Sequence, residues 1–114
     1  MSMMKIFLLM IICLFIASCA ARRASVSMEK IDLQLIEAYY YEKTGQHELA
    51  NQIYLSMIQR APYSGAVHNN YGVFLCRRGY LRKGVQQFLL AAHNRAYPKK
   101  QMAYHNAVLC EKKE

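Results

Sequence analysis

Few side chains in this chain of 114 residues combine into a pattern that catalysis or metal binding requires. The four cysteines include no C-x-x-C pair and no cysteine–histidine cluster at the spacing of a metal site. The sequence also has no nucleophile elbow, no phosphate-binding loop and no paired-carboxylate motif. We therefore expect no enzyme activity, no catalytic residue, no metal and no cofactor. We interpret the four histidines as surface or packing residues: His47, His68, His93 and His105.

The cysteine with the most informative neighbours is Cys19. It ends the tetrapeptide Ile16-Ala17-Ser18-Cys19, in which an aliphatic residue and two small residues precede a thiol. This segment resembles the lipobox of bacterial lipoproteins, where the thiol accepts a diacylglyceryl group and a peptidase removes the residues before it. The resemblance implies that residues 1–18 are a lipoprotein signal peptide and that Cys19 carries a covalent lipid. An ordinary signal peptide with an incidental cysteine is the alternative.

The residues before Cys19 have the order of a secretory signal, a single lysine followed by an apolar run. That run, from Ile6 to Ala17, would be about 18 Å long as a helix, against a hydrocarbon core of about 30 Å. We therefore predict a signal peptide rather than a membrane-spanning helix. Ala20 follows the cysteine, and resemblance to known lipoproteins implies sorting to the periplasmic face of the outer membrane. Residues 19–29 are then interpreted as a tether between lipid and domain.

The mature chain would keep two further thiols, Cys76 and Cys110. A disulfide between them could form in an oxidising periplasm. We expect two buried free thiols instead, because helix packing already needs small apolar residues at such places.

The rest of the chain is patterned for helices, and strand signals are weak. Chemically similar residues recur at an offset of 34, which is the tetratricopeptide period. We therefore predict an all-α tetratricopeptide-repeat solenoid of about two and a half repeats. The repeats would span 30–64 and 65–98, followed by a capping helix or partial third repeat at 99–114. The recurring pairs are Ala38 and Gly72, Gly45 and Gly79, Ala50 and Gly84, and Tyr54 and Phe88.

Small residues recur where paired helices of such a repeat come closest. Ala38 and Gly72 lie on the first helix of each predicted repeat, and Ala50 and Gly84 face them from the second. A large side chain at these places would collide with the opposite helix. A glycine inside a helix costs about 1 kcal/mol relative to alanine, so Gly84 is best explained by packing.

The other recurring pairs have different expected roles. Tyr54 and Phe88 would each cover the following helix. Gly45 and Gly79 would lie in the turns between helices, where a left-handed backbone favours glycine. Because Pro98 falls two residues late, we infer a two-residue insertion within 94–97. So short an array is expected to be marginally stable alone, and could depend on a partner or on self-association.

The first helices of such repeats line a concave groove. The corresponding candidates for protein binding here are Leu35, Tyr39, Asn69, Val73 and Arg77. Leu35, Tyr39 and Val73 could hold an apolar peptide side chain, while Asn69 could bond to the peptide backbone. The alternative is that these residues merely pack within a short stack.

The distribution of charge is uneven. No Asp or Glu occurs between Glu48 and Glu111, whereas eight lysines and arginines fall in that stretch. Such a surface could attract an acidic protein or the anionic groups of a cell envelope. The alternative is a solvated basic face with no single ligand. We do not expect nucleic acid as a partner, because the chain has the features of an exported protein.

The stretch from Val67 to Gly79, VHNNYGVFLCRRG, resembles a particular branch of these repeats. It is similar to the type IV pilus biogenesis and stability lipoproteins, the PilF or PilW pilotins, and the similarity extends over most of Lys30 to Cys110. The resemblance implies an envelope protein as partner, namely the pilus secretin, which pilotins help to reach the outer membrane and to form its multimer. Members of the family are usually about twice as long. A general periplasmic scaffold and a truncated remnant are therefore the alternatives.

Overall fold

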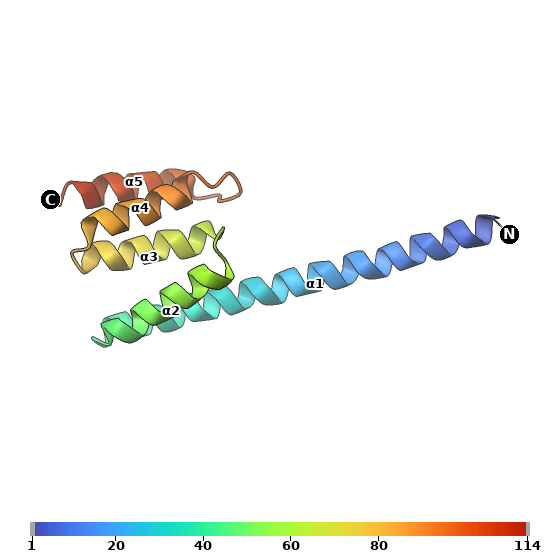
Figure 1. Cartoon of the computed structure of the whole chain (residues 1–114), viewed down its shortest axis with the longest axis horizontal. Helices are drawn as coiled ribbons and strands as arrows, with labels where there is room; N and C mark the ends of the chain where they lie inside the picture. Colours follow the sequence, from blue (N-terminus) through green and yellow to red (C-terminus); the bar gives the residue numbers. More distant parts are fainter. Residues whose placement is uncertain (1, 114) are drawn as a thin grey trace. The chain divides into compact units, whose positions relative to one another are not determined.

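A computed structural model describes residues 2–113, with all their side chains except those of residues 23–27. Every regular element in the described residues is a helix, so the predicted all-α class is confirmed. The chain divides into two compact units, Met1–Leu33 and Gln34–Glu114, and the first helix runs through both. The helices are α1 (Ser2–Lys43), α2 (His47–Arg60), α3 (Gly65–Arg77), α4 (Leu81–Ala92) and α5 (Lys100–Glu111) (Figure 1).

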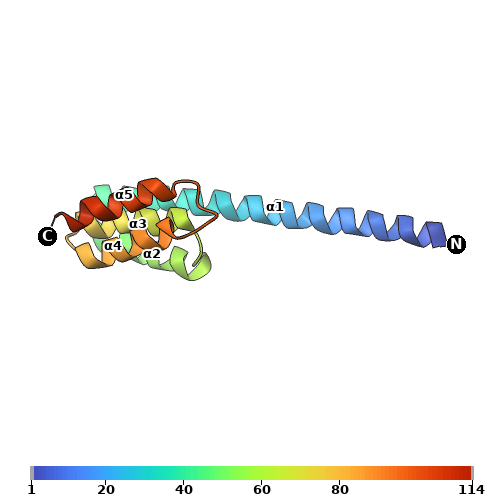
Figure 2. The ribbon, with the colours of Figure 1, turned by 90° about the horizontal axis from the view of Figure 1, so that it is seen from above.

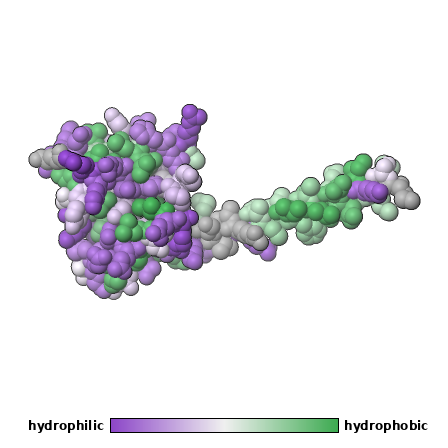
Figure 3. All heavy atoms as spheres, viewed as in Figure 1, coloured by the Kyte–Doolittle hydropathy of each residue, from purple (hydrophilic) through white to green (hydrophobic). Residues whose placement is uncertain are grey.

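The N-terminal unit is dominated by apolar surface. The stretch Ser2–Arg22 has 21 residues, a mean hydropathy of 2.5 and no burial, and is long and apolar enough to cross a membrane (Figure 3). As a helix it reaches about 31 Å, roughly the thickness of a hydrocarbon core. The expectation that this region is too short for a span is therefore wrong, because it counted only the uninterrupted apolar run. A signal sequence near the N-terminus shares these properties, so length alone does not separate the two.

The predicted tether, residues 19–29, has a helical backbone within α1. The cause is visible in the sequence, since no glycine or proline occurs before Gly45 and nothing interrupts the helix. The side chains at 23–27 lie outside the described residues.

The C-terminal unit is a series of packed helices joined by short loops. Helix α3 packs against α4, and α4 packs against α5, while α3 also touches α2 and α5. Figures 1 and 2 show α3, α4 and α5 side by side. The core between α3, α4 and α5 contains Cys76, Phe88, Ala107 and Cys110.

The turn between α1 and α2 and the turn between α3 and α4 have the same backbone conformation. The two turns lie 34 residues apart in the sequence. Gly45 and Gly79 have φ of 80° and 85°, the left-handed region that favours glycine. Gln46 and Tyr80 follow with φ/ψ of −88°/60° and −82°/60°. The recurrence in the sequence is thus matched by a recurrence in the backbone.

Helices α3 and α4 meet with their backbones close together. A Cβ placed on Gly84 would lie 3.1 Å from the carbonyl oxygen of Gly72 and 3.2 Å from the amide nitrogen of Cys76. A Cβ placed on Gly72 would lie 2.7 Å from the ring of Phe88. A larger residue at Gly72 or Gly84 would push the two helices apart.

The residues 34 positions before Gly72 and Gly84 are Ala38 on α1 and Ala50 on α2, and they are also closely packed. Ala38 and Ala50 have no exposed surface. Tyr54 of α2 packs on α3 through Tyr71 and Phe74, with both ring centroids 5.3 Å from its own. This aromatic cluster joins α2 to α3.

The loop between α4 and α5 is held against the loop between α2 and α3. The Asn94 side-chain amide donates to the carbonyl oxygen of Tyr63 at 2.6 Å. The ring of Tyr97 occupies the space that a Cβ on Gly65 would need. Glycine at the start of α3 therefore admits the ring that anchors the α4–α5 loop.

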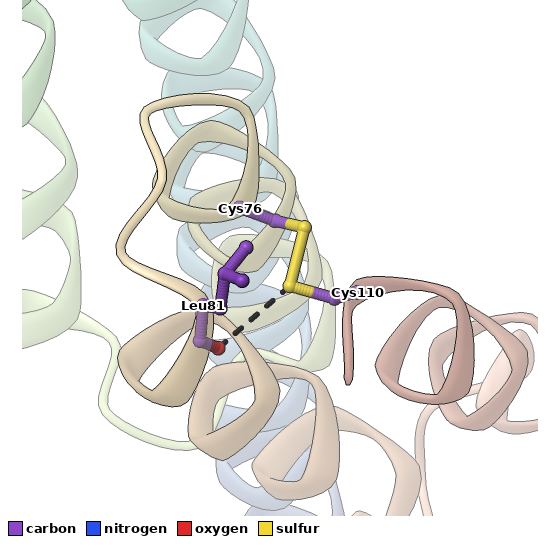
Figure 4. Close-up of a disulfide and its surroundings, with 3 residues drawn as sticks. All are labelled: Cys76, Leu81 and Cys110. Atoms are coloured by element: carbon purple, nitrogen blue, oxygen red, sulfur yellow. Dashed lines mark hydrogen bonds between the residues drawn. A yellow bond between two sulfur atoms is a disulfide. The ribbon is translucent and has the colours of Figure 1, made fainter. Parts of the chain in front are cut away.

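A disulfide joins Cys76 of α3 to Cys110 of α5 (Figure 4). The expectation of two free thiols is therefore wrong. The α3–α4–α5 stack brings alternate helices together, so that the two Cα atoms lie 5.9 Å apart, a separation typical of disulfides. The sulfur of Cys110 also lies 3.7 Å from the carbonyl oxygen of Leu81.

Candidate functional site

The predicted lipid-attachment residue, Cys19, is an exposed free cysteine on α1. Lipid attachment to the thiol, and cleavage of the chain before it, would both need this access. Cys13 is a free cysteine on the same helix and is equally exposed. Exposure therefore does not distinguish the two thiols. The prediction that Cys19 is the lipid-attachment residue depends on the lipobox-like residues before it.

Two of the five predicted groove residues share a cavity between α3 and α5. Val73 and Arg77 line this cavity, which has a volume of about 180 Å³. Helix α5 contributes Asn106, Leu109 and Lys113 to the same walls. Sequence reasoning missed these three residues because it extended the groove only along the two complete repeats. We call this cavity the α3–α5 groove.

Asn69 does not offer its side-chain oxygen to a ligand. The residue is 5% exposed, and its Oδ1 accepts a hydrogen bond from Asn106 Nδ2 at 3.1 Å. This bond holds α5 against α3. Asn69 therefore has a packing role in this structure, and Asn106 is the amide that lines the groove.

Arg77 connects α3 to the C-terminal end of α1. Its Nη1 lies 3.2 Å from Oε1 of Glu42, whose side chain is 8% exposed, while the Arg77 side chain remains 47% exposed. A guanidinium has five N–H donors, so this pair leaves donors for a further anion. The Glu42 carboxylate also acts on Tyr54: burial above all, and then this charge, raise the Tyr54 pKa to about 12, against the opposing effect of Arg77.

Leu35 and Tyr39 are not among the residues that line the α3–α5 groove. Leu35 is half-buried, and Tyr39 is half-exposed with Lys43 Nζ 5.1 Å from the centroid of its ring. Of the five predicted residues, only Val73 and Arg77 line this cavity.

A second, larger cavity of about 300 Å³ lies between α2, α3 and α4, and we call it the α2–α4 pocket. Its α3 residues are mostly buried and aromatic, and their sequence pattern is that of ordinary helix packing, which is why sequence reasoning missed the site. Its walls are formed by His47, Glu48, Asn51, Tyr71, Phe74, Leu75, Arg78, Tyr80 and Lys83.

Comparison with known proteins finds a relative that is similar over part of the chain. A stretch of 73 residues is 37% identical to an uncharacterized protein of Haemophilus influenzae, and covers 64% of this chain but 41% of that protein. The chain thus spans well under two thirds of the length of this relative. No protein-family model matches the chain, and no solved structure matches it. A function must therefore be argued from the residues themselves.

Proposed function

We propose that this chain is a lipid-anchored helical module that binds another protein of the bacterial envelope, and that it acts as a pilotin of type IV pilus biogenesis. The observation that carries the proposal is the recurrence of one turn geometry at Gly45 and Gly79, 34 residues apart. Repeats of this length form tetratricopeptide arrays, whose stacked helices present extended surfaces to protein partners.

Export and anchoring are supported by two independent features. The first is the exposed apolar stretch Ser2–Arg22, which contains the lipobox-like residues before the accessible Cys19. The second is the disulfide between Cys76 and Cys110, because such bonds persist in oxidising compartments such as the periplasm. Ala20 after the lipidated cysteine favours the periplasmic face of the outer membrane as the final location.

The α3–α5 groove is the surface on which we propose that the partner binds. Val73 and Leu109 would hold an apolar side chain, Asn106 would bond to the peptide backbone, and Arg77 would steer an acidic neighbour. Leu109 is 47% exposed and lines the groove, so its side chain is accessible to a partner.

Deleting the gene and following secretin multimers in the outer membrane tests the pilotin proposal. We expect the deletion to reduce the multimers, and complementation by the intact chain to restore them. Leu109→Glu should fail to restore them, because a carboxylate in the groove would reject an apolar ligand. Leu90→Glu is the matched control, since Leu90 is 53% exposed and lies on α4 outside the lining of the groove.

Unchanged multimers and pili in the deletion strain would contradict the pilotin proposal. A photocrosslinker at position 109 then distinguishes the two alternatives. Crosslinking to a different envelope protein would support a general scaffold, and absence of any crosslink would support a remnant that keeps only anchor and fold.

A further inference from the structure

The α2–α4 pocket uses a different face of α3 from the α3–α5 groove. Tyr71, Phe74 and Arg78 line the pocket, whereas Val73 and Arg77 line the groove. Residues two apart on a helix, such as Tyr71 and Val73, point in nearly opposite directions because each residue turns the helix by about 100°. The two cavities could therefore be occupied independently.

The pocket has an aromatic floor with fixed geometry. Tyr71 and Phe74 pack against each other with ring centroids 6.1 Å apart, and the Tyr71 hydroxyl donates to Asn51 Oδ1 at 2.9 Å. Tyr80 adds a ring that is 57% exposed at the rim. A volume of about 300 Å³ is at the lower end of the range for ligand pockets, enough for one or two side chains.

The rim is predominantly positive. Arg78 and Lys83 are exposed, and Lys83 Nζ lies 5.8 Å from the centroid of the Tyr80 ring. Glu48 is the acidic residue in the lining, and its Oε1 accepts a hydrogen bond from Gln52 Nε2 at 3.4 Å. Two cations and one carboxylate thus line the pocket, which gives its charged groups a net positive charge.

A buried nitrogen in the same walls is unpaired. Within residues 2–113 as described, Nδ1 of His47 is a buried side-chain atom without a hydrogen-bond partner. An unpaired buried polar atom costs free energy, and such atoms often mark places where a ligand or water completes the site. His47 therefore adds a polar group to a site that already has aromatic and cationic walls.

We propose that the α2–α4 pocket binds an acidic peptide segment in which a carboxylate lies next to an aromatic side chain. The carboxylate would lie between Arg78 and Lys83, and the ring would pack on the exposed Tyr80 ring above the aromatic floor. This goes beyond the proposed function, because the pocket requires neither the lipid nor the α3–α5 groove. An anionic membrane surface would use the cations but not the recessed aromatic floor.

The test uses the full chain in detergent and the unlabelled peptide acetyl-Gly-Glu-Phe-Glu-Gly-amide, with affinity measured by isothermal titration calorimetry. Blocked ends ensure that the only carboxylates on the peptide are the two Glu side chains. The double variant Arg78→Gln with Lys83→Gln should weaken binding about tenfold or more, because it removes both charge-assisted contacts. The matched control, Arg95→Gln with Lys99→Gln, removes the same charge from exposed residues outside the pocket lining and should change affinity less than about twofold.

Two single variants sharpen the assignment of roles. Tyr80→Ala should weaken binding about threefold, because it removes the ring at the rim but no charge. Glu48→Gln should strengthen binding about twofold, because it removes the one carboxylate that repels the ligand. Far-UV circular dichroism of each variant should match that of the intact chain.

Several outcomes would overturn the proposal. Equal losses in the pocket and control doubles would show that binding follows overall charge. Equal binding of the peptide with Gln in place of both Glu residues would show that no carboxylate is recognised. Binding to phosphatidylglycerol vesicles that depends on Arg78 and Lys83, without binding to the peptide, would show that the site is a membrane contact. A further measurement uses the peptide with Gln in place of both Glu residues and with a free C-terminus. Binding of this peptide alone would show that the pocket recognises a terminal carboxylate and not a side-chain carboxylate.

Discussion

The two units of this chain use the same apolar residue types in opposite ways. Phe7 and Phe15 of the N-terminal unit are 68% and 70% exposed, whereas Phe74 and Phe88 of the C-terminal unit are 3% and 2% exposed. In the first unit the apolar side chains are exposed along a helix that is long and apolar enough to cross a membrane, a property that a signal sequence shares. In the second unit they are held between helices and stabilise the fold.

Truncating one phenylalanine in each unit tests this contrast most strongly. Phe88→Ala should destabilise the C-terminal unit by about 3–5 kcal/mol, because it removes a buried ring and leaves a cavity. Phe15→Ala should leave the unfolding transition unchanged. Urea unfolding of the full chain in detergent, followed by circular dichroism, measures both. A comparable loss in both variants would contradict the division into one packed and one unpacked unit.

The cysteines provide a second matched contrast. Replacing Cys76 and Cys110 together by serine should cost about 3–4 kcal/mol, because the bond closes a loop between residues 34 apart in the sequence. Cys13→Ser should cost nothing measurable, since this cysteine is free and exposed. Thermal unfolding with and without reductant gives the comparison. If reductant leaves the midpoint of the intact chain unchanged, the disulfide does not stabilise the unit.

Within the C-terminal unit, replacing a glycine by alanine should lower the free energy of unfolding by different amounts at two positions. Gly72→Ala should destabilise by about 2 kcal/mol, because the added Cβ would meet the buried Phe88 ring at 2.7 Å. Gly45→Ala should cost about 1 kcal/mol, because nothing lies near its Cβ and only the left-handed backbone is strained. Denaturant midpoints rank the two variants. The reverse ranking would argue against close helix contact at Gly72.

The smallest effect concerns pH. Because the Tyr54 pKa is raised from 10.0 to about 12 in the folded chain, the stability it contributes is complete below pH 10 and is lost as the pH rises towards 12. The slope from one such group is at most about 1.4 kcal/mol per pH unit. Urea unfolding between these pH values should show the decline, and Tyr54→Phe should reduce its slope. Some slope should remain, since burial also raises the pKa of Tyr71 and Tyr97. An identical slope in the variant would exclude Tyr54 as a source.

The features that sequence reasoning predicted are those fixed by local pattern. The helical class, the turns at Gly45 and Gly79 and the small residues at 72 and 84 follow from spacing and from what glycine allows. The disulfide was missed because it depends on the contact between alternate helices, which no local pattern encodes. The offset of 34 between Cys76 and Cys110 was nevertheless present as a signal.

The candidate sites were harder to predict than the fold. Val73 and Arg77 share a cavity, but its other half comes from α5, and Asn69 is engaged by Asn106. The α2–α4 pocket is formed largely by residues whose types suit both a core and a binding floor. Only the three-dimensional arrangement shows that Arg78 and Lys83 line the same pocket.

The central claim is that Cys19 anchors this chain through a covalent lipid, and metabolic labelling of cells with palmitate tests it directly. The intact chain and Cys13→Ser should both incorporate label, because Cys13 shares the exposure of Cys19 but lacks its lipobox-like neighbours. Cys19→Ser should incorporate none. Label retained in Cys19→Ser, or lost only in Cys13→Ser, would contradict the lipoprotein assignment.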